Sequence, residues 1–336
     1  MKIAVVIPTH RRGPLLRSAL ASVRDQSRTG VISEVIVSEN SDDPGSLAVA
    51  AEFPELPIRH VFQNPPVDVF RHFCQLLEYG ESDWVAFLGD DDMWGRYHLE
   101  DAVRGLSAHP EAVAYAGQFV CVTNTGRTAV GAASYPLAEN LGNRDRLFQD
   151  CWVFSTLDMG VASLLLTPFN MWGLVGRRAA LAQAFQAFTE PGAGYDSDRY
   201  MFWLLSQAGP IVIGREIGLF YRYHDCNANA RFLTEDFVYQ QRMAGEYTRR
   251  ILLDAEYKGL PIRKAWHDAV SPMPMRARQK YWESATPGAK QALVEAWGRA
   301  IEDMFVPPTN PFKRLACDLT PPFLWRQASR VRGYFS

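Results

Sequence analysis

The stretch Trp84-Val-Ala-Phe-Leu-Gly-Asp-Asp-Asp-Met-Trp94 places three consecutive carboxylates directly after an apolar run. The run Trp84–Leu88 predicts a buried strand of a parallel sheet, because such a sheet is covered on both faces. Three acids within one turn repel one another, and a divalent cation bound through oxygen ligands relieves that repulsion. Since ligands bind at the carboxyl ends of strands in open α/β sheets, this position favours a ligand site over a solvated turn that caps a helix.

Outward from this stretch, short apolar runs alternate with helical patterns through the first 120 residues. Such alternation predicts parallel strands joined by crossover helices. The expected fold class is therefore α/β, with a mostly parallel sheet flanked by helices. The predicted strands are Ile3–Ile7, Glu34–Ser38, Ile58–Phe62, Trp84–Leu88 and Ala112–Val122.

Two other strand exits are expected at the same edge of the sheet as the acidic run. The first strand leaves through Pro8-Thr-His-Arg-Arg-Gly-Pro14, where basic side chains such as Arg11 and the N–H groups of the next helix can meet a phosphate. A plain loop between strand and helix is the alternative there. The second strand leaves through Glu39, whose carboxylate can accept a hydrogen bond from a ribose hydroxyl or a base N–H.

Two downstream segments also carry candidate chemistry. Asp196 and Asp198 precede an apolar helical pattern, so they either cap that helix or supply a general base. His224 ends a predicted strand in a polar segment, which makes it a candidate ligand, and imidazole suits manganese better than magnesium. A lone histidine on a strand is more often structural.

The order of these pieces resembles glycosyltransferase family 2, whose fold is called GT-A. The resemblance covers about residues 1–225 and rests on Val5-Val-Ile-Pro-Thr9, Val35-Ile-Val-Ser-Glu-Asn-Ser41 and the acidic run. It implies that Pro8, Thr9 and Glu39 contact the nucleoside of a nucleotide-diphospho-sugar. The turn Phe169-Asn-Met-Trp-Gly173 is similar to the family's acceptor-proximal turn, and Trp94 is the one aromatic residue given a sugar-contact role.

The resemblance also implies that Asp90 and Asp92 form a motif binding Mn²⁺ or Mg²⁺ on the diphosphate, with His224 close to both. Gly89 stands where the family often has Asp, so either Asp90 or Asp91 is the ribose and sugar contact, and Asp92 is the principal metal ligand expected.

Eleven residues before Gly209, Asp198 falls where the family's catalytic base stands, with Asp196 as the alternative. The implied activity is inverting, metal-assisted sugar transfer to a hydroxyl of a glycan or lipid-linked acceptor. A sugar-1-phosphate nucleotidyltransferase is the second hypothesis, although it normally opens with a Gly-rich phosphate loop that Pro8–Gly13 does not form. A non-catalytic sugar-binding protein on a degenerate fold is the third, and it predicts loss of acids that are present here.

The composition limits location and partners. Hydrophobic residues make up 47% and charged residues 21% of the 336, which excludes disordered and fibrous classes. A net charge of −2 gives no field to hold a polyanion, so no nucleic-acid partner is expected. The five cysteines lie far apart without a C-x-x-C pair, which favours a reducing cytoplasm. No apolar run reaches the length of a membrane span.

The predicted organisation is a GT-A domain over 1–228, divided into a nucleotide-sugar half at 1–123 and an acceptor and catalytic half at 124–228. A helical extension at 229–309 and a tail at 310–336 follow. The tail carries five basic residues against the single Asp318 and alternates them with aromatic and aliphatic residues. This pattern predicts either peripheral contact with the inner face of the cytoplasmic membrane, as for an enzyme of cell-surface polysaccharide synthesis with a polyprenyl-linked acceptor, or a terminal helix docked on the protein.

Overall fold

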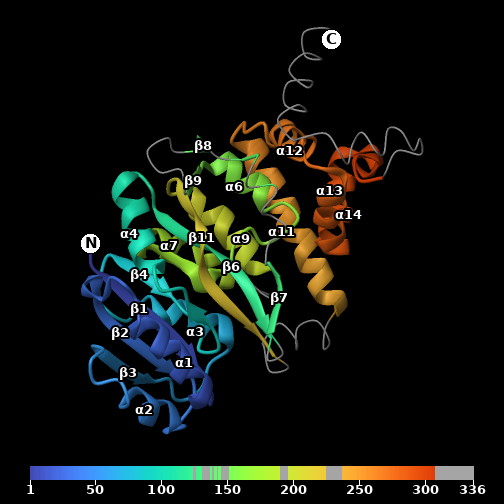
Figure 1. Ribbon diagram of the computed structural model, residues 1–336. Coiled ribbons are helices and arrows are strands. Elements are labelled where there is room, and N and C mark those ends of the chain that lie inside the picture. Colours follow the sequence, from blue (N-terminus) through green and yellow to red (C-terminus); the bar gives the residue numbers. More distant parts are fainter. Residues whose placement is uncertain are drawn as a thin grey trace.

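A computed structural model describes residues 1–123, 126–130, 137, 140–141, 143–144, 151–189, 196–224 and 237–306 (Figure 1). The tail predicted at 310–336 lies outside the described residues. No helix within the described part of the chain combines the length and the apolar character needed to cross a membrane.

The N-terminal part is a parallel block with the strand order β3-β2-β1-β4. Its central strands read as continuous apolar runs because helices or other layers cover both faces, and every residue of β1 and β4 is buried. The strand ends are in register, with Pro8 beside Ser38 and Thr9 beside Glu39. The strands of this block are β1 (Ile3–Thr9), β2 (Ile32–Glu39), β3 (Ile58–Phe62) and β4 (Trp84–Phe87).

Three helices and a short 3₁₀ turn connect these strands. Helix α1 begins at a Gly-Pro pair, and Leu16, Ala19, Leu20 and Val23 form its buried face at helical spacing. Asp68 caps α3, since its carboxylate accepts hydrogen bonds from the backbone N–H groups of the first turn. These elements are α1 (Gly13–Arg24), η1 (Thr29–Val31), α2 (Gly45–Ala50) and α3 (Val69–Leu76).

Beyond β4 the sheet becomes mixed. The short strand β10 (Leu174–Arg177) lies antiparallel between β4 and β6 (Ala114–Thr123), and β6 then pairs in parallel with β11 (Ile211–Tyr223). The sequence did not predict β10, because its four residues follow a turn and are too few to show a period. The remaining strands are β5 (Met93–Trp94), β7 (Gly126–Val130), β8 (Asn143–Arg144) and β9 (Cys151–Phe154). The α/β fold class is confirmed, with one half of the sheet parallel and the other mixed.

Helices cover this second part, and one of them begins at the predicted acids. Helix α9 (Ser197–Ser206) follows Asp196 directly and packs against α6, α7 and α8. Its buried residues Met201, Phe202 and Trp203 join the larger core cluster. The other elements here are α4 (His98–Ala108), α6 (Thr156–Ala162), η2 (Met171–Gly173), α7 (Arg178–Ala184) and α8 (Gln186–Thr189).

The C-terminal helices lie at the opposite end of the molecule from β3 in Figure 1. Helix α11 packs against α9, α12 and α14, while α12 packs against α6. The buried side chains Tyr247, Trp266 and Tyr281 line these contacts, and Trp266 and Tyr281 belong to the same core cluster as Phe87 of β4. The elements are α11 (Phe237–Tyr257), α12 (Ile262–Val270), α13 (Met275–Ser284), α14 (Pro287–Trp297) and η3 (Arg299–Met304).

Candidate active site

The acidic run lies where β4 ends, and all three of its carboxylates are in buried residues. Asp90, Asp91 and Asp92 are 4%, 7% and 0% exposed. The neighbouring strand β1 ends at Thr9, whose hydroxyl donates to Asp90 Oδ2 at 2.7 Å. The parallel pairing of β1 with β4 therefore brings the two predicted strand exits together.

An arginine that the sequence analysis did not single out contacts this run. Arg12 donates from Nη1 to Asp91 Oδ2 at 2.9 Å and to Asp90 Oδ1 at 3.3 Å. The guanidinium of Arg11, by contrast, is exposed and lies 3.3 Å from Asp42. Arg11 has a positive φ of 57°, and this turn directs the two adjacent side chains to different places.

Glu39 at the end of β2 is fully buried and accepts hydrogen bonds from its own neighbourhood. The Arg11 backbone N–H donates to Oε1 at 3.1 Å, and the Ser41 hydroxyl donates to the same oxygen at 2.5 Å. In this arrangement the carboxylate stabilises the β1 exit turn. Pro8, beside Ser38 in the sheet, lies one position before the Thr9 contact.

The end of β11 completes this edge of the site. The backbone N–H of Arg222 donates to Asp92 Oδ1 at 2.8 Å, whereas the buried Asp92 Oδ2 has no hydrogen-bond partner among the described residues. A Cβ on Gly89 would lie 2.9 Å from that oxygen, so the position before the acids is closely packed. His224 Nε2 lies 3.0 Å from Asp91 Oδ2, which means that the structure brings His224 to Asp91.

Burial and mutual repulsion favour the protonated forms of these acids. Burial, followed by the charge of Asp91, raises the pKa of Asp90 to about 7, although Arg12 and Thr9 act in the opposite direction. The same two causes raise the pKa of Asp92 well above its usual range. A bound cation would favour the ionised forms.

The donor atoms fit a hard divalent ion, because they are carboxylate oxygens with one imidazole and include the unpartnered Asp92 Oδ2. Within the described ranges, no group of three or more His, Cys, Asp or Glu side chains is arranged to hold a metal by itself. Ions of the magnesium type are commonly held by one or two carboxylates together with substrate phosphates, so a complete protein cage is not required.

The second pair of acids stands at the start of α9. Asp198 Oδ1 accepts hydrogen bonds from the Thr167 hydroxyl at 3.1 Å and from the Arg199 N–H at 2.9 Å. Burial, and then the charge of Asp196, raise the pKa of Asp198 to about 7. Asp196 has a φ of 70° and lies 3.8 Å from Arg199, and burial raises its pKa as well.

Arg199 itself is fully buried and ties α9 to two other helices. It donates to the carbonyl oxygens of Ser163, Leu164 and Ala244 and to the hydroxyl of Thr248. The signal for it in the sequence is a charged residue within the apolar pattern of α9. Through these bonds, α11 of the helical extension supports the helix that carries Asp198.

The two groups of acids are connected through the segment before η2. Thr167 contacts Asp198, and η2 packs against β4 and β6. The Trp94 indole donates to the Trp172 carbonyl at 2.8 Å, so the turn predicted to lie near the acceptor touches the strand after the acidic run. Trp94 is only 3% exposed and its indole N–H is used inside the fold, but it also lines a groove beside α1, so its sugar contact stays a prediction. Tyr195, part of the predicted acidic segment, lies outside the described residues.

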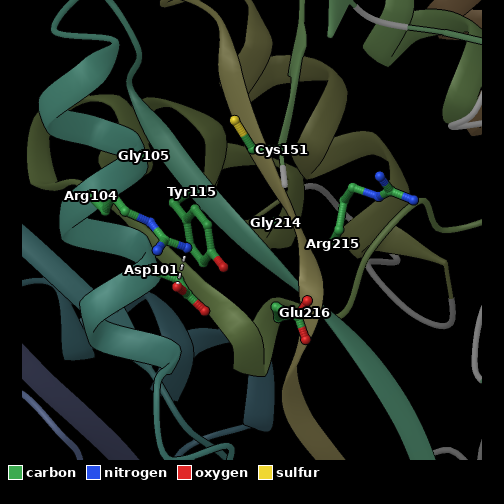
Figure 2. A pocket seen from close by; sticks show the side chains of 8 residues that line it. All are labelled: Asp101, Arg104, Gly105, Tyr115, Cys151, Gly214, Arg215 and Glu216. Atoms are coloured by element: carbon green, nitrogen blue, oxygen red, sulfur yellow. Dashed lines mark hydrogen bonds and ion pairs between the residues drawn. The ribbon is translucent and has the colours of Figure 1, made fainter. Parts of the chain in front are cut away.

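Two pockets lie beside this region. A groove of about 740 Å³ is lined by residues of the second half of α1 and of β5 together with Phe220, and Met93 in its lining follows the acidic run directly in the sequence. Figure 2 shows a smaller pocket of about 20 Å³ between α4, β6 and β11, where Arg104 pairs with Asp101 beside Tyr115. That volume suits about one water molecule, and none of the predicted site residues lines it.

Comparisons with known proteins concern the family and the fold. Residues 4–161 match the family model described as glycosyl transferase family 2. No curated protein sequence matches the chain.

Among solved structures, the chain is similar to S. aureus TarS 1–349, with 14% identity, a TM-score of 0.53 and coverage of 98% of this chain and 92% of that chain. For the same protein in complex with UDP-GlcNAc, the identity is 15% and the TM-score 0.54, with coverage of 98% of this chain and 92% of that chain. The chain is also similar to the mannosyltransferase PcManGT from Pyrobaculum calidifontis in complex with GDP-Man and Mn²⁺. Here the identity is 15% and the TM-score 0.50, with coverage of 99% of this chain and 84% of that chain. At such identities the likeness concerns the fold, and it confirms the predicted GT-A fold.

Proposed function

We propose that this chain, a glycosyltransferase with a family 2 domain over residues 4–161, is an inverting enzyme that acts on a hydroxyl acceptor. The family match confirms the predicted resemblance and the enzyme class. The observation that carries the proposal is the meeting of Thr9, Arg12, the acidic run and His224 at one sheet edge. A second acid, the half-buried Asp198, is connected to it through Thr167.

The donor in this proposal is a nucleotide-diphospho-sugar at the ends of β1, β2 and β4. Thr9 and Glu39 end the neighbouring strands β1 and β2 and would contact the nucleoside, and the N-terminus of α1 would stabilise the diphosphate. The solved relatives in complex with UDP-GlcNAc and GDP-Man support a donor of this class and leave the base open.

A divalent ion, Mn²⁺ or Mg²⁺, would be held by Asp92 and Asp90 with His224, and would supply neutralisation of the departing diphosphate. Asp91, which contacts His224, is the alternative to Asp90 in this set. The Mn²⁺ in the mannosyltransferase complex is consistent with this choice.

The base in this proposal is Asp198. Its carboxylate accepts the proton of the acceptor hydroxyl while the hydroxyl oxygen attacks the anomeric carbon. The bond from that carbon to the diphosphate oxygen breaks on the opposite face, and the configuration inverts. A pKa of about 7 places Asp198 near the optimum for a base at neutral pH, and a positioned base contributes about 10² to 10⁴ in rate.

The acceptor in this proposal is a glycan or a polyprenyl-linked saccharide of cell-surface polysaccharide synthesis. The basic tail, which lies outside the described residues, supports peripheral contact with an anionic membrane. Flotation on anionic and neutral liposomes tests this part. We expect the full chain, and not a chain ending at Thr309, to float with anionic vesicles; equal flotation of both would contradict it.

Thermal unfolding with a panel of nucleotide sugars, each with and without Mn²⁺, tests the donor. One donor should raise the Tm, and more strongly with Mn²⁺, since ligand at 100 times its Kd stabilises by about 2.7 kcal/mol. Release of nucleoside diphosphate in the presence of acceptor glycans then tests transfer. A protein that binds sugars without any turnover would contradict the enzymatic proposal.

A further inference from the structure

We infer that Arg12 is an exchangeable counter-cation of the acidic run, which a divalent ion displaces from Asp91 and which then pairs with the diphosphate of the donor. The inference rests on the proposed function and deepens it, because it names the residue that couples metal binding to donor binding.

The first observation is the geometry of the Arg12 contacts. A single nitrogen, Nη1, contacts both Asp90 and Asp91, at 3.3 and 2.9 Å. Arg17 on the same helix makes a two-pronged pair with Glu52, in which Nε and Nη2 each donate to a different oxygen. The Arg12 contact with the acidic run is therefore shared between two acids through one nitrogen, without the fork geometry that fixes a guanidinium on a single carboxylate.

The second observation is competition for one oxygen. Arg12 Nη1 and His224 Nε2 both lie within about 3 Å of Asp91 Oδ2, at 2.9 and 3.0 Å. A metal ion that took this carboxylate and the imidazole would stand beside a guanidinium of the same sign. Coulomb repulsion would then favour the guanidinium leaving that oxygen.

The third observation is the charge that Arg12 leaves uncompensated. Asp92 is fully buried, and its Oδ2 has no hydrogen-bond partner among the described residues. Arg12 does not contact this carboxylate in the described hydrogen bonds, so the run retains a buried acceptor for a second cation. Such an acceptor is costly unless a cation or a proton satisfies it.

The fourth observation shows where the displaced side chain can go. Arg12 is the N-cap residue of α1, and its carbonyl accepts from the N–H groups of Leu15 and Leu16. Its backbone is therefore fixed at the helix N-terminus, where a phosphate group is stabilised. The side chain is 28% exposed and can rotate toward a bound diphosphate without unfolding the helix.

The test compares two titrations of Arg12→Gln with those of the wild-type protein. The first is Mn²⁺ alone, followed by the spectroscopic signal of free Mn²⁺ and by Tm. The second is UDP and GDP at saturating Mn²⁺. We expect the Mn²⁺ Kd to fall about tenfold and the Kd of the preferred nucleotide to rise about tenfold, because a charge-assisted contact is lost in each state.

The opposite signs of the two shifts separate this role from a structural one, which would weaken both affinities. Arg17→Gln removes an arginine pair from the same helix and should leave both constants unchanged. Arg12→Lys keeps the charge with less directional donors, and both its constants should lie between those of the wild type and Arg12→Gln. It decides the question if the glutamine variant does not fold.

An unchanged or raised Mn²⁺ Kd in Arg12→Gln, or an unchanged nucleotide Kd at saturating Mn²⁺, overturns the inference. Absence of Mn²⁺ binding in both proteins also overturns it, while sugar transfer remains measurable separately. Suppose that the wild type transfers sugar while a chelator removes the metal, and that Arg12→Gln still lowers the Mn²⁺ Kd. Metal assistance of the reaction is then wrong, but displacement of Arg12 by Mn²⁺ stands.

Discussion

Two groups of acids in this molecule are each accompanied by an arginine, and the two arginines are held in different ways. Arg12 touches Asp90 and Asp91 through one nitrogen, and its side chain is partly exposed. Arg199 beside Asp196 is fully buried and donates to three backbone carbonyls and one hydroxyl. Arg199 is thus built into the fold, whereas the proposal above makes Arg12 the cation that can be exchanged.

The difference extends to the acids themselves. Among the described residues, the acidic run has an unpartnered carboxylate oxygen on Asp92, and a metal and a diphosphate are its proposed partners. Asp198 instead receives hydrogen bonds from Thr167 and the α9 backbone, which fix its orientation. Raised pKa values at both places accompany the two tasks proposed for them, binding of a cation and acceptance of a proton.

The largest expected effect is on the exchangeable side. Asp92→Ala should abolish metal-dependent nucleotide binding and transfer, because it removes the principal ligand expected. Its fold should persist, since the change also removes a buried acceptor without a partner. Turnover and the response of Tm to Mn²⁺ measure this. Asp268→Ala, an exposed acid on α12, is the control, and normal turnover of Asp92→Ala would sink the metal assignment.

For the buried arginine, Arg199→Met should lower the free energy of unfolding by about 3–5 kcal/mol, because Asp196 and the buried carbonyl groups lose the cation that they share. Urea denaturation measures the change. Arg17→Gln, which breaks an exposed pair, should cost at most about 1 kcal/mol. Similar costs for the two variants would show that Arg199 is not the structural cation described.

Asp198→Asn should leave donor binding unchanged and reduce turnover by a factor of about 10² or more, as for loss of a base. Steady-state kinetics with separate measurement of the donor Kd provide the test. The matched variant is Asp196→Asn. If that variant shows the large loss while Asp198→Asn does not, the base is Asp196.

The pH dependence gives a smaller and more specific effect. A base acts in its ionised form, so turnover should rise with pH and level off above the Asp198 pKa of about 7. Well below that value the rate should change about tenfold per pH unit. The residual activity of Asp198→Asn should lack this rise of turnover near pH 7. If the rise persists in that variant, it belongs to the titration of another group.

The smallest effect concerns the hydrogen bond from Thr167. This bond favours the ionised carboxylate and lowers the pKa of Asp198, so Thr167→Val should move the pH limb upward, by less than about one unit. The pH–rate profile of the variant measures this shift. Thr189→Val, which removes an exposed hydroxyl bound to the Gln186 carbonyl, should leave the profile in place. A downward shift in Thr167→Val would contradict the assignment.

The sequence predicted most of the N-terminal block because its signals are local. Apolar runs predicted β1 to β4, and the acids after β4 indicated the sheet edge that carries the candidate site. The choice between Arg11 and Arg12 was not accessible, since it depends on a backbone turn with positive φ at Arg11. The bonds of Arg199 join segments far apart along the chain, and no local pattern encodes them.

The placement of β10 has a consequence for the synthesis of this protein. In the folded protein, one edge of β4 pairs with Val175, Gly176 and Arg177 of β10. These residues leave the ribosome long after Trp84, so this edge of β4 is first made without its partner. At typical translation rates the interval is on the order of ten seconds. During that interval the nascent chain exposes the edge of an apolar strand, the kind of surface on which aggregation begins and which chaperones cover. Slower translation between residues 88 and 173 would lengthen this vulnerable period and lower the yield of native protein.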